Sequence, residues 1–199
     1  MSIVKLNNQG VKNATAFGSI TGLGSMTFIK KLTASSSSTL SFVDGASGVV
    51  LDDTYKEYLF TLNNIHPSAN GSLLAMNLSI DSGSNYNVAK TTTFFYALNA
   101  ENNSYAALTY AAGDDLAQGT GFQPIAPIGY GNDECGSAYM SLFNPSSTTF
   151  VKHFLINSSS LQDASGDMYE RNNYAAGYAN TTSAVNAVQF KMLSGNIDA

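Results

Sequence analysis

Charged side chains are scarce in this chain. Only 12% of the 199 residues are Asp, Glu, Lys or Arg, which is about half the share usual in globular domains. The nine basic residues are spread thinly and the formal net charge is -5, so no basic stripe exists that could neutralise a run of phosphates. This composition argues against nucleic-acid binding. It also predicts an unusually neutral surface, built mainly from Ser, Thr, Asn and Gly.

Cysteine and histidine are nearly absent. The single cysteine, Cys135, excludes an intrachain disulfide framework and cannot build a thiolate metal site by itself; we expect it to be a half-buried apolar residue. A catalytic nucleophile needs a base beside it, and the only histidines are His66, in a turn before Pro67, and His153, in a strand-like run. We therefore expect a protein that is not an enzyme and that has no cofactor and no metal site.

Long apolar runs and helical periodicity are also missing. No window approaches the ~18 uninterrupted apolar residues of a membrane span, and the first residues lack the apolar region of a secretory signal. We expect a protein made soluble in a cytoplasm, without membrane insertion. No apolar pattern at i, i+3, i+4 and i+7 persists over three turns, which excludes a helical architecture. Short helical turns are expected at most, at residues 52–56 or 114–117.

What the sequence does contain is the period-two pattern of β-strands. Residues 74–80 place Leu74, Met76, Leu78 and Ile80 on one face, with small or polar residues between them, as in a half-buried strand. Turn clusters separate further runs of this kind. We predict an all-β protein, an antiparallel β-sandwich with a jelly-roll-like order and a single domain over residues 26–199. The other predicted strands are 26–32, 38–43, 58–62, 91–98, 105–110, 138–143, 148–156, 174–178 and 184–193.

Residues 1–25 differ from the rest of the chain. They are rich in Asn, Gly, Ser and Thr and show little periodicity. We interpret them as an extended N-terminal arm that lies on a neighbouring subunit and is ordered only in an assembly. A disordered terminus fits the same composition equally well, because such segments cannot repay their ordering entropy alone.

Carboxylates occur as adjacent pairs beside turn residues. A glycosidase needs two carboxyl groups that face each other across a cleft, whereas neighbours on a strand point to opposite faces. We interpret the pairs as solvated turns, and a hydrolase that uses two acids stays a third hypothesis. Residues 81–85 are similar to a calcium loop, but Tyr86 and Thr92 occupy the required Gly and Glu positions. A turn explains them without an ion. The pairs are Asp52-Asp53, Asp114-Asp115 and Asp133-Glu134.

Tyrosines gather in the second half of the chain among Asn and Gly. Tyr and Phe number eleven each. Buried Tyr can fill a core while its hydroxyl stays hydrated, and exposed Tyr is favoured at subunit and binding interfaces. Three interpretations stay open: core, subunit interface and glycan-binding surface. The candidate binding residues are Tyr130, Tyr139, Tyr169, Tyr174 and Tyr178.

Six segments carry a resemblance: 35–45, 51–60, 64–67, 81–86, 176–192 and 194–198. Together they resemble small β-rich virion structural proteins of tailed phages that infect aquatic bacteria. The resemblance implies a component of a virion, made in the host cytoplasm, such as a capsid decoration protein or a fibre subunit; it carries over no catalytic residue. The similar proteins continue after residues 195–198 into one more apolar strand. This chain stops at Ala199, and without that strand an edge would be left unpaired. A neighbouring subunit could fill this edge.

Two functions follow as expectations. The first is a virion structural protein on the particle exterior, which forms a homo-oligomer, with a trimer as the first expectation, and packs against other virion proteins. The second is a carbohydrate- or receptor-binding β-sandwich module of a phage adhesion device, which would hold a host surface glycan with Tyr rings and Asn side chains.

Overall fold

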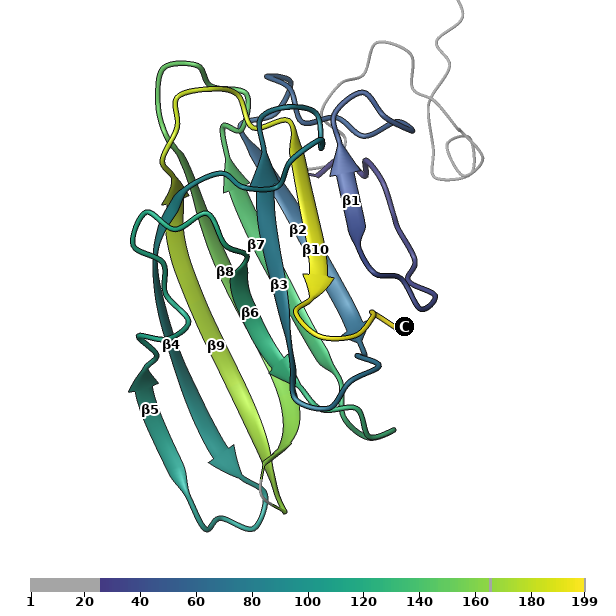
Figure 1. Cartoon of the computed structure of the whole chain (residues 1–199), viewed down its shortest axis with the longest axis vertical. Helices are drawn as coiled ribbons and strands as arrows, with labels where there is room; N and C mark the ends of the chain where they lie inside the picture. Colours follow the sequence, from purple (N-terminus) through teal and green to yellow (C-terminus); the bar gives the residue numbers. More distant parts are fainter. Residues whose placement is uncertain (1–25, 165, 199) are drawn as a thin grey trace, which may run out of the picture.

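The structure, a computed structural model, describes residues 26–164 and 166–198. It confirms the predicted all-β sandwich: the described part of the chain contains ten strands and no helix, and the strands form two antiparallel sheets (Figure 1). No described helix is therefore long and apolar enough to cross a membrane. The predicted N-terminal arm, residues 1–25, lies outside the described residues.

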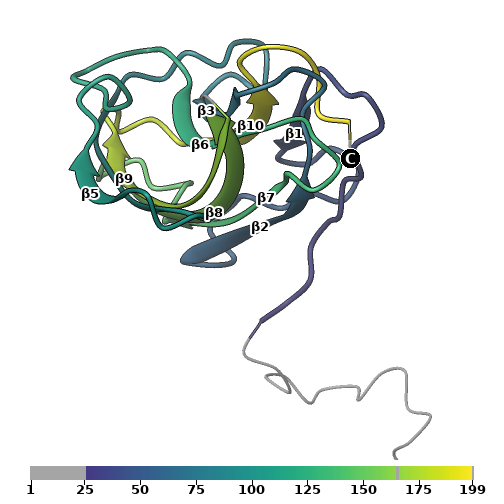
Figure 2. The same ribbon diagram turned by 90° about the horizontal axis from the view of Figure 1, so that it is seen from below.

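The two sheets differ in size, and they face each other (Figure 2). The smaller one has four strands, in the order β1 (Leu40–Val43), β10 (Ala187–Met192), β3 (Ser72–Ser79) and β6 (Gln123–Ile128). The larger one has six, in the order β2 (Glu57–Ile65), β7 (Gly136–Phe143), β8 (Lys152–Ala164), β9 (Asp167–Ala179), β4 (Lys90–Ala100) and β5 (Ala106–Tyr110).

Strand pairing follows a nested order. β1 pairs with β10, β2 with β7, β3 with β6 and β4 with β5. The long hairpin of β8 and β9 lies between β7 and β4. As a result, most neighbours in each sheet are distant in sequence, and the faces of the sheets combine residues from the whole described chain.

One apolar core fills the space between the sheets. Phe94, Phe154 and Met140 enter it from the larger sheet, and Met76 and Phe190 enter it from the smaller sheet. All five side chains are almost completely buried. Full burial of a side chain of this size stabilises a fold by roughly 1.5–3 kcal/mol, so the alternation of apolar residues fixes which face of each strand turns inward.

Three sequence predictions about local structure are wrong. Residues 26–32 belong to no ladder, and none of them makes a backbone–backbone hydrogen bond to another described residue. Residues 52–56 and 114–117 form bends and turns without helix. β6 was not predicted, because Pro124 and Pro127 interrupt its sequence. Proline cannot donate to a ladder and is tolerated at an edge, and β6 is the edge strand of the smaller sheet.

Candidate functional site

The most distinctive surface of the molecule is the outer face of the larger sheet, the face turned away from the smaller sheet. Side chains alternate along each strand, so the residues between the buried ones point outward here. Leu155 is 54% exposed and Leu108 is 75% exposed on this face. Such exposure shows that no described segment covers the centre or the β5 end of the face.

A row of residues crosses all six strands of this face. Each member is the register partner of the next, so their side chains stand side by side about one strand spacing apart. The rings of Phe95 and Tyr174 stack on each other, with centroids 5.0 Å apart and planes at 11°. We call these residues the aromatic row. From β2 to β5 they are Thr61, Tyr139, Asn157, Tyr174, Phe95 and Tyr110.

The aromatic row ends in a hydrogen bond at the β5 edge. The hydroxyl of Tyr110 donates to a carboxylate oxygen of Asp115 at 2.5 Å. This bond raises the pKa of Tyr110 above its ordinary value, because loss of the proton would place two negative charges side by side. The bond holds the exposed Tyr110 ring in one orientation.

Charge is nearly absent from this face. The register places no Lys or Arg on the outward positions of the six strands, and the carboxylates there include Glu57 and Glu170. Both accept hydrogen bonds at 2.7 Å from neighbouring hydroxyls, Glu57 from Ser141 and Glu170 from Ser159. A face of this kind can approach a second neutral surface without a large desolvation cost.

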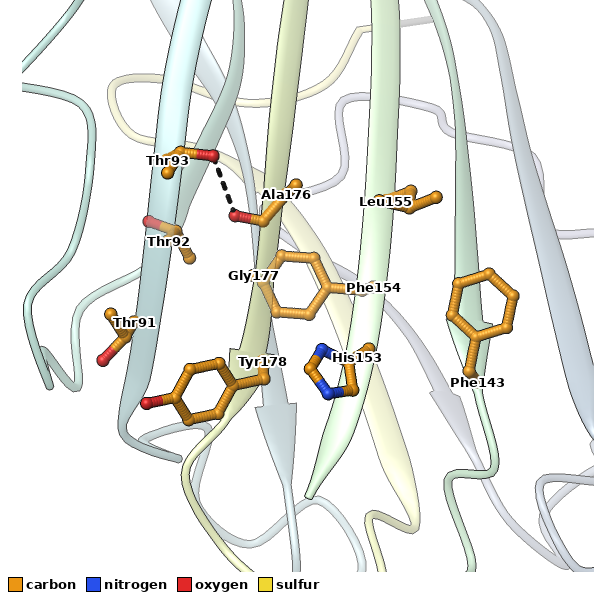
Figure 3. A pocket seen from close by; sticks show the side chains of 10 residues that line it. All are labelled: Thr91, Thr92, Thr93, Phe143, His153, Phe154, Leu155, Ala176, Gly177 and Tyr178. Atoms are coloured by element: carbon orange, nitrogen blue, oxygen red, sulfur yellow. Dashed lines mark hydrogen bonds between the residues drawn. The ribbon is translucent and has the colours of Figure 1, made fainter. Parts of the chain in front are cut away.

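Two shallow depressions lie on the same face. The larger, of about 500 Å³, is lined at one end by His153 and Tyr178, whose rings pack with centroids 5.8 Å apart (Figure 3). Thr93 donates a hydrogen bond to the backbone oxygen of Ala176 beside it. The lining is therefore mostly methyl groups, rings and hydroxyls.

The smaller depression, of about 280 Å³, is lined by Tyr139 with Asn63 and Asn157 beside it. The Tyr139 side chain is 52% exposed. Asn157 donates through Nδ2 to Asn172 Oδ1 at 3.1 Å, which fixes its amide in one orientation. A ring beside oriented amides can stack on a flat apolar group and hydrogen-bond its rim.

The structure brings three of the five candidate tyrosines to one face. Tyr139, Tyr174 and Tyr178 all point outward from the larger sheet. Tyr169 belongs to the other alternating set of side chains in β9, so it points to the other side of the sheet, where it lies half-buried. Tyr130 lies in the loop between β6 and β7 and is 57% exposed. Only the first three therefore belong to a common surface.

Sequence reasoning did not select Phe95, Tyr110, Leu108 and Leu155 for this face. Their exposure depends on which of the two alternating sets of side chains in each strand turns inward. In β4 both sets contain an aromatic residue, Phe94 in one and Phe95 in the other. The cross-strand register, which aligns residue 61 with residue 139 and residue 95 with residue 174, is not local in sequence. The sequence signal that could have found these residues is a strand with apolar residues in both of its alternating sets of side chains.

The two histidines considered for chemistry lie at opposite ends of the larger sheet. His66 lies in the turn after β2, where Nε2 is 3.1 Å from the backbone oxygen of Gly131, while His153 lies on the outer face. Cys135 is exposed, not half-buried as predicted. The neighbouring Glu134 turns inward beside Gly129 and Gly131, where an added side chain would meet its carboxylate.

Two acidic segments differ in how well the turn interpretation fits them. Asp81 accepts hydrogen bonds from Ser79 and from both nitrogens of Asn85. These bonds lower the pKa of Asp81 to about 2, and its oxygens serve the turn itself. Glu134 is buried and not solvated as predicted; it accepts a hydrogen bond from the Gly131 N–H at 2.6 Å and another from the Asp163 N–H.

No metal cluster can be built from the described residues. Residues 26–164 and 166–198 contain no group of three or more His, Cys, Asp and Glu side chains that could hold an ion. Comparison with protein-family models, curated proteins and solved structures found no match to the chain.

Proposed function

We propose that this chain is a structural protein on the exterior of a bacteriophage virion, either a capsid decoration protein or a fibre subunit. It works by packing against neighbouring copies and other virion proteins. The observation that carries the packing part is the outer face of the larger sheet, with its aromatic row and almost no charge. The phage part rests on the resemblance of residues 35–45, 51–60, 64–67, 81–86, 176–192 and 194–198 to virion proteins.

The size of the outer face supports this proposal. Six strands about 4.8 Å apart, about ten residues long on average at 3.3 Å per residue, cover roughly 950 Å². A stable specific interface buries about 800 Å² on each partner. Tyrosine and phenylalanine, which occupy the centre of the face, are the residue types enriched at such interfaces.

The order of the strands supports a jelly roll. A jelly roll has eight antiparallel strands in two sheets, and it forms when a long hairpin of nested strand pairs rolls up. Removing the hairpin of β8 and β9 leaves eight strands with the nested pairs 1 and 10, 2 and 7, 3 and 6, and 4 and 5. We infer a jelly roll in which the β8–β9 hairpin widens the larger sheet. This fold occurs in viral capsid and lectin domains, which is agreement by analogy alone.

The packing proposal is tested with the variant Tyr174→Asp. A carboxylate at the centre of an interface loses its hydration on association, so self-association measured by analytical ultracentrifugation should weaken at least tenfold. Ile80→Asp is the matched control, because Ile80 is 43% exposed and Tyr174 is 41% exposed, but Ile80 lies outside the larger sheet. Equal association of both variants and the wild-type chain would contradict the use of this face.

A second function, glycan binding, is favoured by one specific observation. The smaller depression places the Tyr139 ring between Asn63 and Asn157, and rings with adjacent amides are suited to the apolar face and hydroxyl rim of a sugar. A glycan array should then show binding that Tyr139→Ala abolishes and Tyr130→Ala retains. A silent array at high protein concentration would count against this function and leave the packing function in place.

A further inference from the structure

Residues 26–35 form a strand-like segment that pairs with no described strand. None of them makes a backbone–backbone hydrogen bond to another described residue, although the chain is extended there. Figure 2 shows the start of the segment leading away from the two sheets, and its later part lies on the side of the sandwich that carries β1. Two contacts hold it: Lys30 Nζ donates to the backbone oxygen of Ser47 at 3.0 Å, and Ser37 just beyond it pairs with Ile197.

The side chains of this segment suit a strand that adds to a sheet. From Lys31 to Ser35 exposed and half-buried residues alternate. Ile29 and Ala34 pack against the core, while the Phe28 side chain is 80% exposed. A row of free backbone groups with exposed apolar side chains is a template for pairing with another sheet edge.

One edge of the sandwich can receive such a strand over its whole length. β2 is an edge of the larger sheet and spans Glu57–Ile65, nine residues, of which Glu57–Leu62 pair with β7 in regular register. The other edges are poorer. β1 has four residues and β5 has five. β6 contains Pro124 and Pro127, which lack the N–H groups that a ladder needs.

Charge makes the segment and this edge complementary. Lys30 and Lys31 are the only adjacent basic pair in the sequence. Exposed acidic residues, Asp53 and Glu57, lie just before and at the start of β2. In a protein with so few charges, two cations opposite two anions favour one pairing over the alternatives.

We propose that residues 26–35 of one copy add as a strand to β2 of a second copy. The inference rests on the proposed packing function and names one of its contacts. The contact joins two different surfaces, the segment of one copy and the β2 edge of the next. When it repeats around a closed ring, the segment of every copy is paired and the β2 edge of every copy is covered. A trimer satisfies this condition, as does a reciprocal dimer.

The test uses the full chain with charge reversal on either side of the contact. Lys30→Glu/Lys31→Glu and, separately, Asp53→Lys/Glu57→Lys should each weaken association at least tenfold in analytical ultracentrifugation. The chain that carries all four substitutions should recover association to within about threefold of the wild type. Asp133→Lys/Glu101→Lys is the control for Asp53→Lys/Glu57→Lys, because it makes the same change in net charge at exposed sites outside β2.

Hydrogen exchange adds a readout that does not depend on the variants. In the assembled protein the amides of residues 26–35 and 57–65 should exchange slowly, and both sets should lose protection together when dilution dissociates the assembly. An assembly in which residues 26–35 exchange as fast as a free peptide overturns this inference and leaves the packing function standing. So does a quadruple variant that stays dissociated. A chain that is monomeric at every concentration contradicts both.

Discussion

At the scale of single residues, close packing between β9 and β4 leaves no room for a side chain at Gly177. A methyl group there would lie 2.5 Å from the backbone oxygen of Thr91, and a backbone atom cannot move aside as a side chain could. We expect Gly177→Ala to lower the free energy of unfolding by about 1–3 kcal/mol. Gly113→Ala is the control, because a methyl group there meets nothing within 4 Å. Equal denaturation midpoints for both variants would show that the strands are less tightly packed.

Lys90 gives a prediction for pH. The side chain is fully buried, and Nζ donates to Asn77 Oδ1 and to the backbone oxygen of Val88. Burial lowers the pKa of Lys90 from 10.5 to about 8. The folded state therefore binds this proton less tightly than the unfolded state does, and the stabilisation is complete above pH 10.5 and lost as pH falls through 8.

The expected change in the free energy of unfolding is on the order of 3 kcal/mol across this window. Urea titrations at intervals from pH 7 to 10.5 measure it. Other groups also titrate there, so the quantity of interest is the wild-type curve minus the curve of Lys90→Met. A difference that stays constant with pH would mean that Lys90 keeps its ordinary pKa in the folded state.

At the scale of elements, the buried Glu134 carboxylate connects the loop before β7 to the end of β8. It accepts hydrogen bonds from the N–H groups of Gly131 and Asp163. Glu134→Ala leaves both donors without this partner, and we expect a loss of about 1–3 kcal/mol in the free energy of unfolding. The neighbouring Asp133 is exposed, so Asp133→Ala should change stability little. A Glu134→Ala variant as stable as Asp133→Ala would show that water replaces the carboxylate.

The sequence predicts the elements better than it predicts their surroundings. Alternation in residues 74–80 correctly predicts a strand, β3, but the predicted half-burial is wrong, because Asn77 and Ser79 are buried as well and Ile80 is exposed. The same logic fails for β6, where Pro124 and Pro127 break the pattern, and for residues 26–32, whose pattern is right for a strand but whose partner is not in the described chain. Strand pairing depends on contacts that local sequence does not contain.

The candidate site could likewise be predicted from the sequence only in part. The sequence selects Tyr139 and Tyr174 as candidate binding residues but leaves core and surface both open for them, and it does not predict the aromatic row. The row requires the registers of five strand pairs at once, and Phe95 and Tyr110 enter it only through those registers. Tyr169 shows the opposite case, since one residue of offset in β9 turns it to the other side of the sheet.

At the scale of the whole molecule, the two surfaces that matter are the outer face of the larger sheet and the unpaired segment with its receiving edge. The outer face is poor in charge, whereas the segment and the edge carry opposite charges. Both surfaces combine exposed apolar side chains with hydrogen-bonding groups. In the proposed function, copies of the chain cover these surfaces and the contacts themselves are the function.

The mass of the full chain in solution tests this account most directly. Light scattering coupled to size-exclusion chromatography, over a wide range of concentrations, should give a multiple of the 21.0 kDa chain mass, with the trimer as the first expectation. Tyr174→Asp and Lys30→Glu/Lys31→Glu should each shift the mass toward that of a single chain. A mass of one chain at every concentration, together with no binding to purified virions, would contradict the account.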